Sequence, residues 1–178
     1  MLLLLSISLV MLMGGCLSTH HIVGAVGEKH NGGIAMEVKS VFGNNERIPT
    51  KYGCEGEDVN PELEVSGIPE EAKSLAIIMD DPDAPGGTWV HWVAWNIPIG
   101  NIEEGTRAGV KGKNSWGKLG YGGPCPPRGH GIHHYHFKVY ALDSQLTLAE
   151  GTTKEELLKA MEEHIVGEAE LVGLYSRD

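Results

Sequence analysis

One segment of the chain is apolar at every position, and this constrains the fold more than any other feature of the sequence. All five residues between Ser74 and Asp80 are apolar, so an extended chain presents apolar side chains on both of its faces there. This pattern is typical of a central strand in a sheet that is covered on both sides. The segments Trp89–Ile97 and His134–Leu142 predict two further strands of this kind.

The rest of the sequence predicts short elements joined by turns. The chain contains 25 glycines and 9 prolines, which favour tight connections between short strands over a helix bundle. Met36–Phe42 and Leu63–Val65 predict short strands near the start of the domain, and Glu168–Tyr175 predicts the last strand.

One helix is predicted near the C-terminus. Thr153 and Glu156 form the pattern in which two side chains cap the first turn of a helix. Leu157 and Met161 then follow at helical spacing. We expect this helix to end near residues 164–167, within a domain that is otherwise mostly β.

The first sixteen residues resemble a lipoprotein signal. Residues 1–13 are almost wholly apolar, and two glycines then precede Cys16, although no Lys or Arg precedes the apolar run. The run is shorter than the roughly 20 residues of a membrane-spanning helix, and the glycines end any buried core helix. We expect a signal over residues 1–16 with a lipid on Cys16, a flexible linker over 17–33, and a folded domain over 34–178. This predicts a domain that is held at the cell membrane and faces outside the cytoplasm.

The charge of the chain bears on its partners. The formal net charge is -10, and an acidic surface repels nucleic acid unless a basic stripe offsets it. No such stripe stands out in the sequence. We therefore expect a hydrated domain surface and no nucleic-acid partner.

Two irregular segments carry residues that favour a binding site. The predicted central strand, Ser74–Asp80, runs directly into Asp81-Pro82-Asp83-Ala84-Pro85. Carboxylates at the end of a buried strand are costly unless they are hydrogen-bonded or face a cleft. Later in the chain, residues 120–131 are rich in glycine and proline. A loop of this composition can turn backbone N–H groups toward an anion.

Histidines lie on the two strands that adjoin these segments. On the predicted strand Trp89–Ile97, alternation predicts that His91 shares a face with Val93. Where the chain enters the strand His134–Leu142, alternation predicts that His133 and Tyr135 point inward and that His134 faces solvent or a loop. A histidine on an apolar face is more often a core residue than a functional one. The position of His91 soon after an acidic loop nevertheless favours a binding role for it.

Together these segments resemble the two signature regions of the phosphatidylethanolamine-binding protein family, and most closely its bacterial and archaeal branch, often labelled Raf-kinase-inhibitor-like. The similarity runs from about Met36 to Tyr175. It implies two stacked antiparallel sheets with peripheral helices, and a small pocket near one end that accepts phosphate-type groups. The motif positions are Asp81, His91, His133 and Tyr135 in the pocket, Pro85 and Pro126 in its wall, and Gly123 in the adjoining loop.

The side chains that the resemblance implies fit a small anionic ligand. A protonated histidine donates to a phosphate oxygen, and Tyr135 adds a neutral donor. Asp81 can orient a histidine or accept from an ethanolamine-like ammonium group. Eukaryotic members commonly have an arginine where this chain has His134, so a phosphate contact from that arginine is not carried over. We expect anion binding that strengthens as the pH falls through the histidine pKa, and no cofactor.

Two chemical alternatives compete with this prediction. Asp and His side chains could act as acid and base in a hydrolase, but the chain has no G-x-S-x-G motif, and Cys125 stands between two prolines. His130, His133, His134 and His136 could hold a metal, but neighbours on a strand point to opposite faces, and paired Cys or HExxH patterns are missing. We expect neither an enzyme nor a metal site.

A third alternative is a protein inhibitor that uses the pocket as a docking surface. Eukaryotic members of the family are linked to kinase and protease inhibition. An exported protein does not meet cytoplasmic kinases, so inhibition of an extracellular protease or regulation of another, unknown protein partner stays open.

The remaining cysteines bear on the compartment. If Cys16 carries lipid, Cys54 and Cys125 remain, and both lie in loops rich in glycine and proline. Outside the cytoplasm they are free to form a disulfide at the pocket rim. They could equally be two small buried apolar residues, and the sequence leaves both possibilities open.

Overall fold

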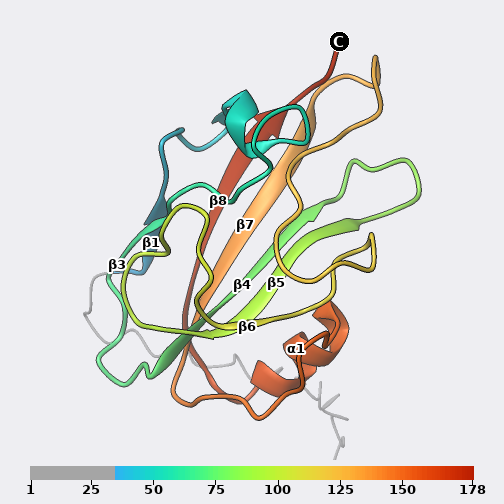
Figure 1. The fold of residues 1–178 in the computed structure, drawn as a ribbon. Helices are drawn as coiled ribbons and strands as arrows, with labels where there is room; N and C mark the ends of the chain where they lie inside the picture. The colour runs from blue at the N-terminus through green and yellow to red at the C-terminus, as the bar shows by residue number, and fades with distance from the viewer. Residues whose placement is uncertain (1–34) are drawn as a thin grey trace, which may run out of the picture. The chain divides into compact units, whose positions relative to one another are not determined.

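The computed structural model describes residues 35–178 (Figure 1). The predicted signal over 1–16, with Cys16, and the predicted linker over 17–33 lie outside the described residues. Within residues 35–178, no helix is both long enough and apolar enough to cross a membrane.

The described residues form a six-stranded sheet, a two-stranded sheet and one α-helix. The large sheet has the strand order β2-β8-β7-β4-β5-β6, and the small sheet pairs β1 with β3. In chain order the elements are β1 (Glu37–Lys39), β2 (Glu46–Arg47), the short 3-10 helix η1 (Thr50–Tyr52), β3 (Glu64–Ser66), β4 (Ser74–Asp81), β5 (Trp89–Ile97), β6 (Val110–Lys111), β7 (His133–Leu142), α1 (Lys154–Met161) and β8 (Ile165–Tyr175).

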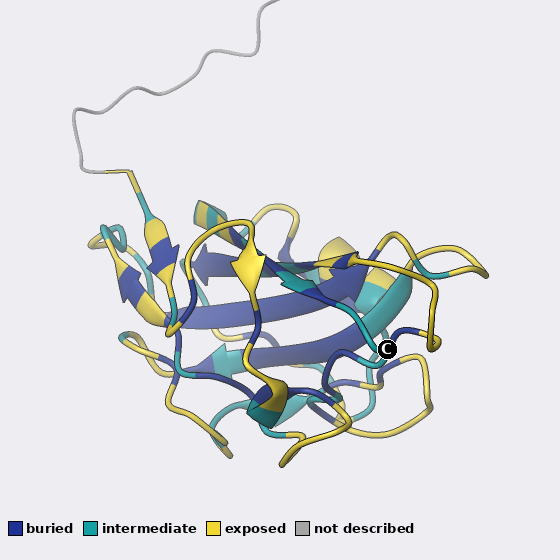
Figure 2. Ribbon diagram, turned by 90° about the horizontal axis from the view of Figure 1, so that it is seen from above, coloured by how far each residue is buried: buried dark blue, intermediate teal, exposed yellow. Residues whose placement is uncertain are grey.

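Strand β4 is central because it is apolar on both faces. It lies between β5 and β7 and is antiparallel to both, and all of its residues are buried. One face of the large sheet packs against a core that includes Val38 of β1 and Val65 of β3. The opposite face packs against Leu157 and Met161 of α1. Figure 2 shows the buried strands between these more exposed layers.

The start of helix α1 is the one that the sequence predicts. The Thr153 hydroxyl accepts from the Glu156 backbone N–H, and the Glu156 side chain accepts from the Thr153 N–H. The helix ends at Met161, earlier than expected, because β8 already begins at Ile165. The ammonium group of Lys154, in the first turn, forms an ion pair with buried Asp80, which fastens the helix to the sheet.

The prediction of a mostly β fold with two sheets and a C-terminal helix is confirmed. One pair departs from the antiparallel rule, because β2 runs parallel to β8 at the edge of the large sheet. All other paired strands among the described residues are antiparallel.

Candidate functional site

The central strands bring three of the predicted residues together at one end of the sheet. Asp81 ends β4, His133 begins β7, and His91 lies near the start of β5. Because β4 is antiparallel to both neighbours, its end lies beside the starts of β5 and β7. A cavity of about 230 Å³ opens there, lined by Asp81, Ala84, Pro85, Gly86, Trp89, His91, Trp116, Cys125, Pro126, Pro127 and His133.

Asp81 and His133 form a buried pair in this cavity. The His133 Nδ1 lies 2.7 Å from Asp81 Oδ2, and the two side chains are 1% and 3% exposed. Asp81 Oδ1 also accepts from the Asp83 backbone N–H at 2.8 Å. On the other side of the ring, His133 Nε2 lies 2.7 Å from His130 Nδ1. The carboxylate therefore orients His133, and a chain of hydrogen bonds leads from Asp81 through His133 to His130.

His91 reaches the cavity because β5 is irregular. Met79 pairs with Trp92 but Asp80 pairs with Val90, so His91 is the extra residue of a bulge. A bulge changes the direction of a side chain, and the His91 ring packs 5.1 Å from the Tyr135 ring. The expectation that His91 shares a face with Val93 is thus wrong, because regular alternation does not hold across the bulge. Val93 faces the core on the α1 side.

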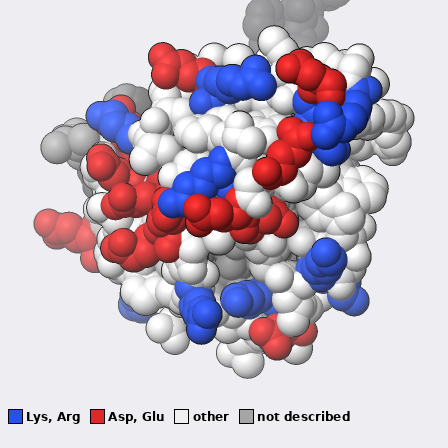
Figure 3. Space-filling model, turned by 45° about the horizontal axis from the view of Figure 1, so that its top comes forward, with Lys and Arg blue, Asp and Glu red and all other residues white. Residues whose placement is uncertain are grey.

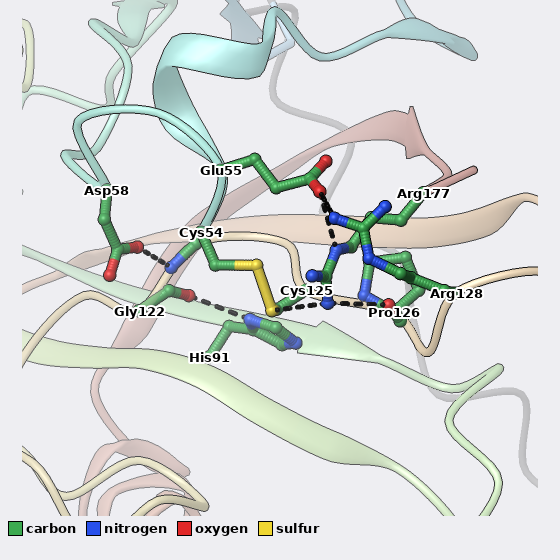
Figure 4. The surroundings of a disulfide bond; sticks show 10 residues. Cys54, Glu55, Asp58, His91, Gly122, Cys125, Pro126, Arg128 and Arg177 are labelled. Atoms are coloured by element: carbon green, nitrogen blue, oxygen red, sulfur yellow. Dashed lines mark hydrogen bonds and ion pairs between the residues drawn. A yellow bond between two sulfur atoms is a disulfide. The ribbon is translucent and has the colours of Figure 1, made fainter.

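The glycine-rich loop fixes the tautomer of His91. Its Nδ1 lies 2.8 Å from the Gly122 carbonyl oxygen, which can only accept, so Nδ1 carries a proton (Figure 4). In the neutral ring, Nε2 is therefore the unprotonated nitrogen. Burial lowers the pKa of His91 below its usual value, and the Gly122 carbonyl and the charge of Asp81 offset this only in part. His91 is accordingly neutral at pH 7.

One polar hydrogen at the site has no acceptor among the described residues. The Trp89 indole Nε1 is buried without a hydrogen-bond partner in residues 35–178, whereas the Tyr135 hydroxyl is buried near the Asp81 carboxylate. A buried donor left unpaired costs about 1–3 kcal/mol. Burial and the charge of Asp81 raise the pKa of Tyr135 well above its usual value, so its hydroxyl stays protonated. Of the two groups, only the Trp89 N–H belongs to a residue that lines the cavity and lacks an acceptor within residues 35–178.

Gly123 does not line this cavity. It allows the backbone of the loop to pack closely against a neighbouring segment. A Cβ on Gly123 would lie 2.2 Å from the Tyr52 carbonyl oxygen and 2.8 Å from Asp58 Oδ1. Its N–H donates to Asp58 Oδ1 at 2.6 Å. Only glycine permits this close approach, which holds the neighbouring Gly122 carbonyl against His91. Gly123 lines a separate cavity of about 150 Å³ beside the site.

A disulfide forms part of the wall of the candidate site. Cys54 and Cys125 are bonded, with their Cα atoms 5.4 Å apart. Figure 4 shows the bond between the loop after η1 and the segment that holds Pro126. Arg177 donates to Cys125 Sγ and to the Pro126 carbonyl oxygen, each at 3.3 Å. Of the two possibilities left open by the sequence, the structure contains the disulfide.

The structure thus places five of the seven predicted site residues in the cavity wall: Asp81, Pro85, His91, Pro126 and His133. Tyr135 lies behind them, 0% exposed, with its ring against those of His91 and His133. His134 faces outward, as predicted, and its Nδ1 lies 2.7 Å from Asp83 Oδ2. This hydrogen bond lowers the pKa of Asp83.

Sequence reasoning missed two aromatic residues of the site. Trp89 and Trp116 pack edge to face with ring centroids 5.4 Å apart, and Trp116 also contacts the His91 ring at 4.9 Å. Trp89 could have been found, because it stands two residues before His91 at the start of a predicted strand. Trp116 lies in a loop with no motif, so only the fold reveals it.

Among the described residues, no cluster of three His, Cys, Asp or Glu side chains has an arrangement that could hold a metal ion. All four histidines considered for a metal have hydrogen-bond partners. His133 is hydrogen-bonded to Asp81, His134 to Asp83, His136 to Glu170 and His130 to His133.

Comparison with known proteins identifies relatives over most of the chain. The family model described as phosphatidylethanolamine-binding protein matches residues 38–176. A UPF0098 protein of Pyrococcus abyssi is 60% identical over 152 residues, which is 80% of this chain and 85% of that protein.

Two solved structures share the fold. A phosphatidylethanolamine-binding protein homologue of Chlamydia trachomatis matches with a TM-score of 0.77 and 44% identity, over 81% of this chain and 99% of that one. YbcL of E. coli, described as a member of the mammalian PEBP family, matches with a TM-score of 0.74 and 30% identity, over 82% of this chain and 100% of that one. The chain therefore belongs to the phosphatidylethanolamine-binding protein family, in company with bacterial and archaeal members.

Proposed function

We propose that this protein binds a small anionic ligand, of the phosphate or phospho-head-group type, in the cavity between Asp81, His91 and His133. The observation that carries the proposal is that Trp89 lines the cavity and that its indole N–H is buried without an acceptor among residues 35–178. An oxyanion brings several acceptors and satisfies such a donor. The volume of about 230 Å³ is below the ~300 Å³ at which pockets for drug-sized ligands begin, which suits a head group rather than a whole lipid.

His91 supplies the charge that favours an anion. Its Nε2 lacks a proton at neutral pH, so the ring must take up a proton before it can donate to an oxyanion. A bound anion stabilises the protonated ring and raises its pKa. Burial lowers the pKa of His91 in the free protein. The affinity for an anion should therefore increase as the pH falls below about 6.5.

Asp81 does not prevent an anion from binding. One of its oxygens accepts from His133 and the other from the Asp83 N–H, so its charge is partly offset within the protein. A carboxylate has about four acceptor positions, which leaves room to accept from an ammonium group. A ligand that carries both a phosphate and an ammonium group, such as phosphorylethanolamine, suits this combination.

The proposed location is outside the cytoplasm, with the domain anchored through a lipid on Cys16. The disulfide between Cys54 and Cys125 supports this placement, because disulfides persist mainly in oxidising compartments. Mass spectrometry of the membrane-associated protein should find a lipidated Cys16 at a new N-terminus, and Cys16→Ala should release the protein from the membrane. Finding residues 1–15 still attached and Cys16 unmodified would contradict the anchor.

Catalysis is not part of the proposal. The only cysteine considered as a nucleophile, Cys125, is engaged in the disulfide. The chain of hydrogen bonds from Asp81 to His130 orients a donor, and we assign it a binding role.

Calorimetric titration with phosphate and phosphorylethanolamine tests the proposal. Saturable binding is expected, and below about pH 6.5 His91→Ala should weaken it at least about tenfold, since one charge-assisted hydrogen bond contributes about 1.5–3 kcal/mol. The matched control is His164→Ala, which removes a histidine bonded to Asp143 outside the cavity. A parallel titration with sulfate, whose charge is constant, should show affinity rising as the pH falls below about 6.5. Binding that is equal in the two variants would refute the assignment, and no binding at all would favour the protein-docking alternative.

A further inference from the structure

A long segment of this acidic chain contains basic residues and no acidic ones. The chain has 24 Asp and Glu residues against 14 Lys and Arg residues, yet none of the 24 lies between Glu104 and Asp143. The basic residues of that segment are Arg107, Lys111, Lys113, Lys118, Arg128 and Lys138. The expectation from sequence that no basic region stands out therefore misses a local concentration of positive charge.

Four of these cations have no carboxylate partner in the part of the chain that the structure describes. Arg128 pairs with Glu55, and Lys138 pairs with Asp80. The four in residues 107–118 form no ion pair with any residue of 35–178. Figure 3 shows acidic side chains gathered in a band across one face, and basic side chains below this band with few acidic neighbours.

Two of the four unpaired cations line a second cavity, of about 220 Å³. We call it the basic cavity and define it by Arg107, Lys111, Trp92, Ala94, Leu119 and Tyr121. It shares no lining residue with the cavity of Asp81 and His133. Trp92 and Ala94 join its lining to the hydrophobic core, and Tyr121 packs edge to face on Trp92 at 5.5 Å.

The turn that carries Arg107 is held in place by a buried amide. Asn60 is 3% exposed, and its Nδ2 donates to the carbonyl oxygens of Pro61 and Glu103 at 2.9 Å each. Its Oδ1 accepts from the Thr106 N–H at 2.9 Å. These bonds fix the backbone next to Arg107, so the cavity wall is formed before any ligand arrives.

The backbone at Lys111 is held by contacts of its own. Lys111 lies on β6, where it pairs with Ala94 of β5, and its carbonyl oxygen accepts from the Gly151 N–H at 2.8 Å. The one carboxylate in the lining is that of Asp58, and its Oδ1 already accepts from the Gly123 N–H. The lining therefore carries two positive charges against one negative charge.

We propose that the basic cavity is a second ligand site, which takes a small organic anion: a carboxylate or phosphate group joined to an apolar or aromatic body. Arg107 and Lys111 bind the oxyanion, and Trp92, Ala94 and Tyr121 accept the body. A guanidinium group can bind either oxyanion through two parallel hydrogen bonds. This proposal does not rest on ligand binding at the first cavity.

Titration with phenyl phosphate and with benzoate tests the second site. The full-length protein is used with His91→Ala in place, so that the first cavity is impaired in every sample. Against this background, Arg107→Gln and Lys111→Gln should each weaken binding at least about tenfold, the loss expected for one charge-assisted hydrogen bond. Inorganic phosphate, which lacks the apolar body, should bind more weakly than phenyl phosphate. A stronger response to one of the two probes identifies the preferred oxyanion.

Lys113→Gln is the matched control. Lys113 lies two residues from Lys111, carries the same charge and does not line the basic cavity, so its loss should leave affinity unchanged within about twofold. Unaltered melting temperatures establish that the variants fold. Equal affinities of the Arg107→Gln, Lys111→Gln and Lys113→Gln variants would overturn the proposal, and so would the absence of saturable binding of both probes to the His91→Ala protein.

Discussion

Replacing Cys54 and Cys125 by alanine removes a covalent link between two loops that are 71 residues apart in sequence. In the chain-entropy description, a cross-link stabilises a protein by restricting its unfolded state. For a closed loop of 71 residues the relation gives roughly 15 cal/mol/K, or about 4.4 kcal/mol at room temperature. This is a large fraction of the roughly 5–15 kcal/mol by which domains are stable.

The assay is equilibrium unfolding in urea with linear extrapolation to water. The chain has three cysteines. The assay is carried out in a Cys16→Ala background, which leaves only Cys54 and Cys125. The double alanine variant should lose about 4 kcal/mol, and values between about 2 and 5 kcal/mol fit the usual range for native disulfides. Reductant should destabilise the parent protein by a similar amount and leave the double variant unchanged.

A loss below about 1 kcal/mol would contradict a stabilising role of the disulfide, and two free thiols in the parent protein before reduction would contradict its presence. The consequence for the site is separate. Cys125 lines the cavity beside Pro126 and Pro127, so reduction should also weaken phosphate binding, under conditions where the protein is still folded.

Three further predictions concern stability. Gly123→Ala should cost at least about 1–3 kcal/mol in urea unfolding, because its Cβ would lie 2.2 Å from the Tyr52 carbonyl oxygen; a neutral result would mean that the loop shifts freely. Thr153→Ala should cost about 1 kcal/mol, because it removes the acceptor at the start of α1, and no loss would show that the cap does not contribute. His91 should make stability depend on pH. Burial lowers its folded pKa, so the unfolded chain takes up a proton first as the pH falls below about 6.5, and stability declines from there down to the folded pKa. The stability of the wild type relative to His91→Gln, which keeps a donor for Gly122, should therefore fall on acidification, and a constant difference would contradict this sign.

The central strands and the helix could be predicted because their sequence patterns are local. The apolar residues of β4 require cover on both faces, and the Thr153–Glu156 pair caps a helix wherever it occurs. Alternation along β7 also predicted correctly that His133 and Tyr135 are buried and that His134 is exposed.

The features that could not be predicted depend on contacts between distant segments. The bulge at His91 arises in the pairing of β5 with β4, so alternation along β5 alone gives the wrong face. The disulfide requires the loops of Cys54 and Cys125 to meet, which only the fold decides. The basic cavity likewise depends on where the turn at Arg107 lies relative to β6, and the acidic net charge of the whole chain conceals it.

The most direct test of the account is the indole N–H signal of Trp89 in a ¹H–¹⁵N NMR titration of the full-length protein with phosphate. The chain has four tryptophans, and Trp89→Phe assigns the signal. Trp95 is an internal control, because its Nε1 is also buried without a partner among residues 35–178 but lies in the core on the α1 side. If an oxyanion binds at this cavity, the Trp89 signal shifts saturably while that of Trp95 stays in place. A Trp89 signal that does not move, or that moves only together with that of Trp95, would contradict the claim that an oxyanion binds at this cavity.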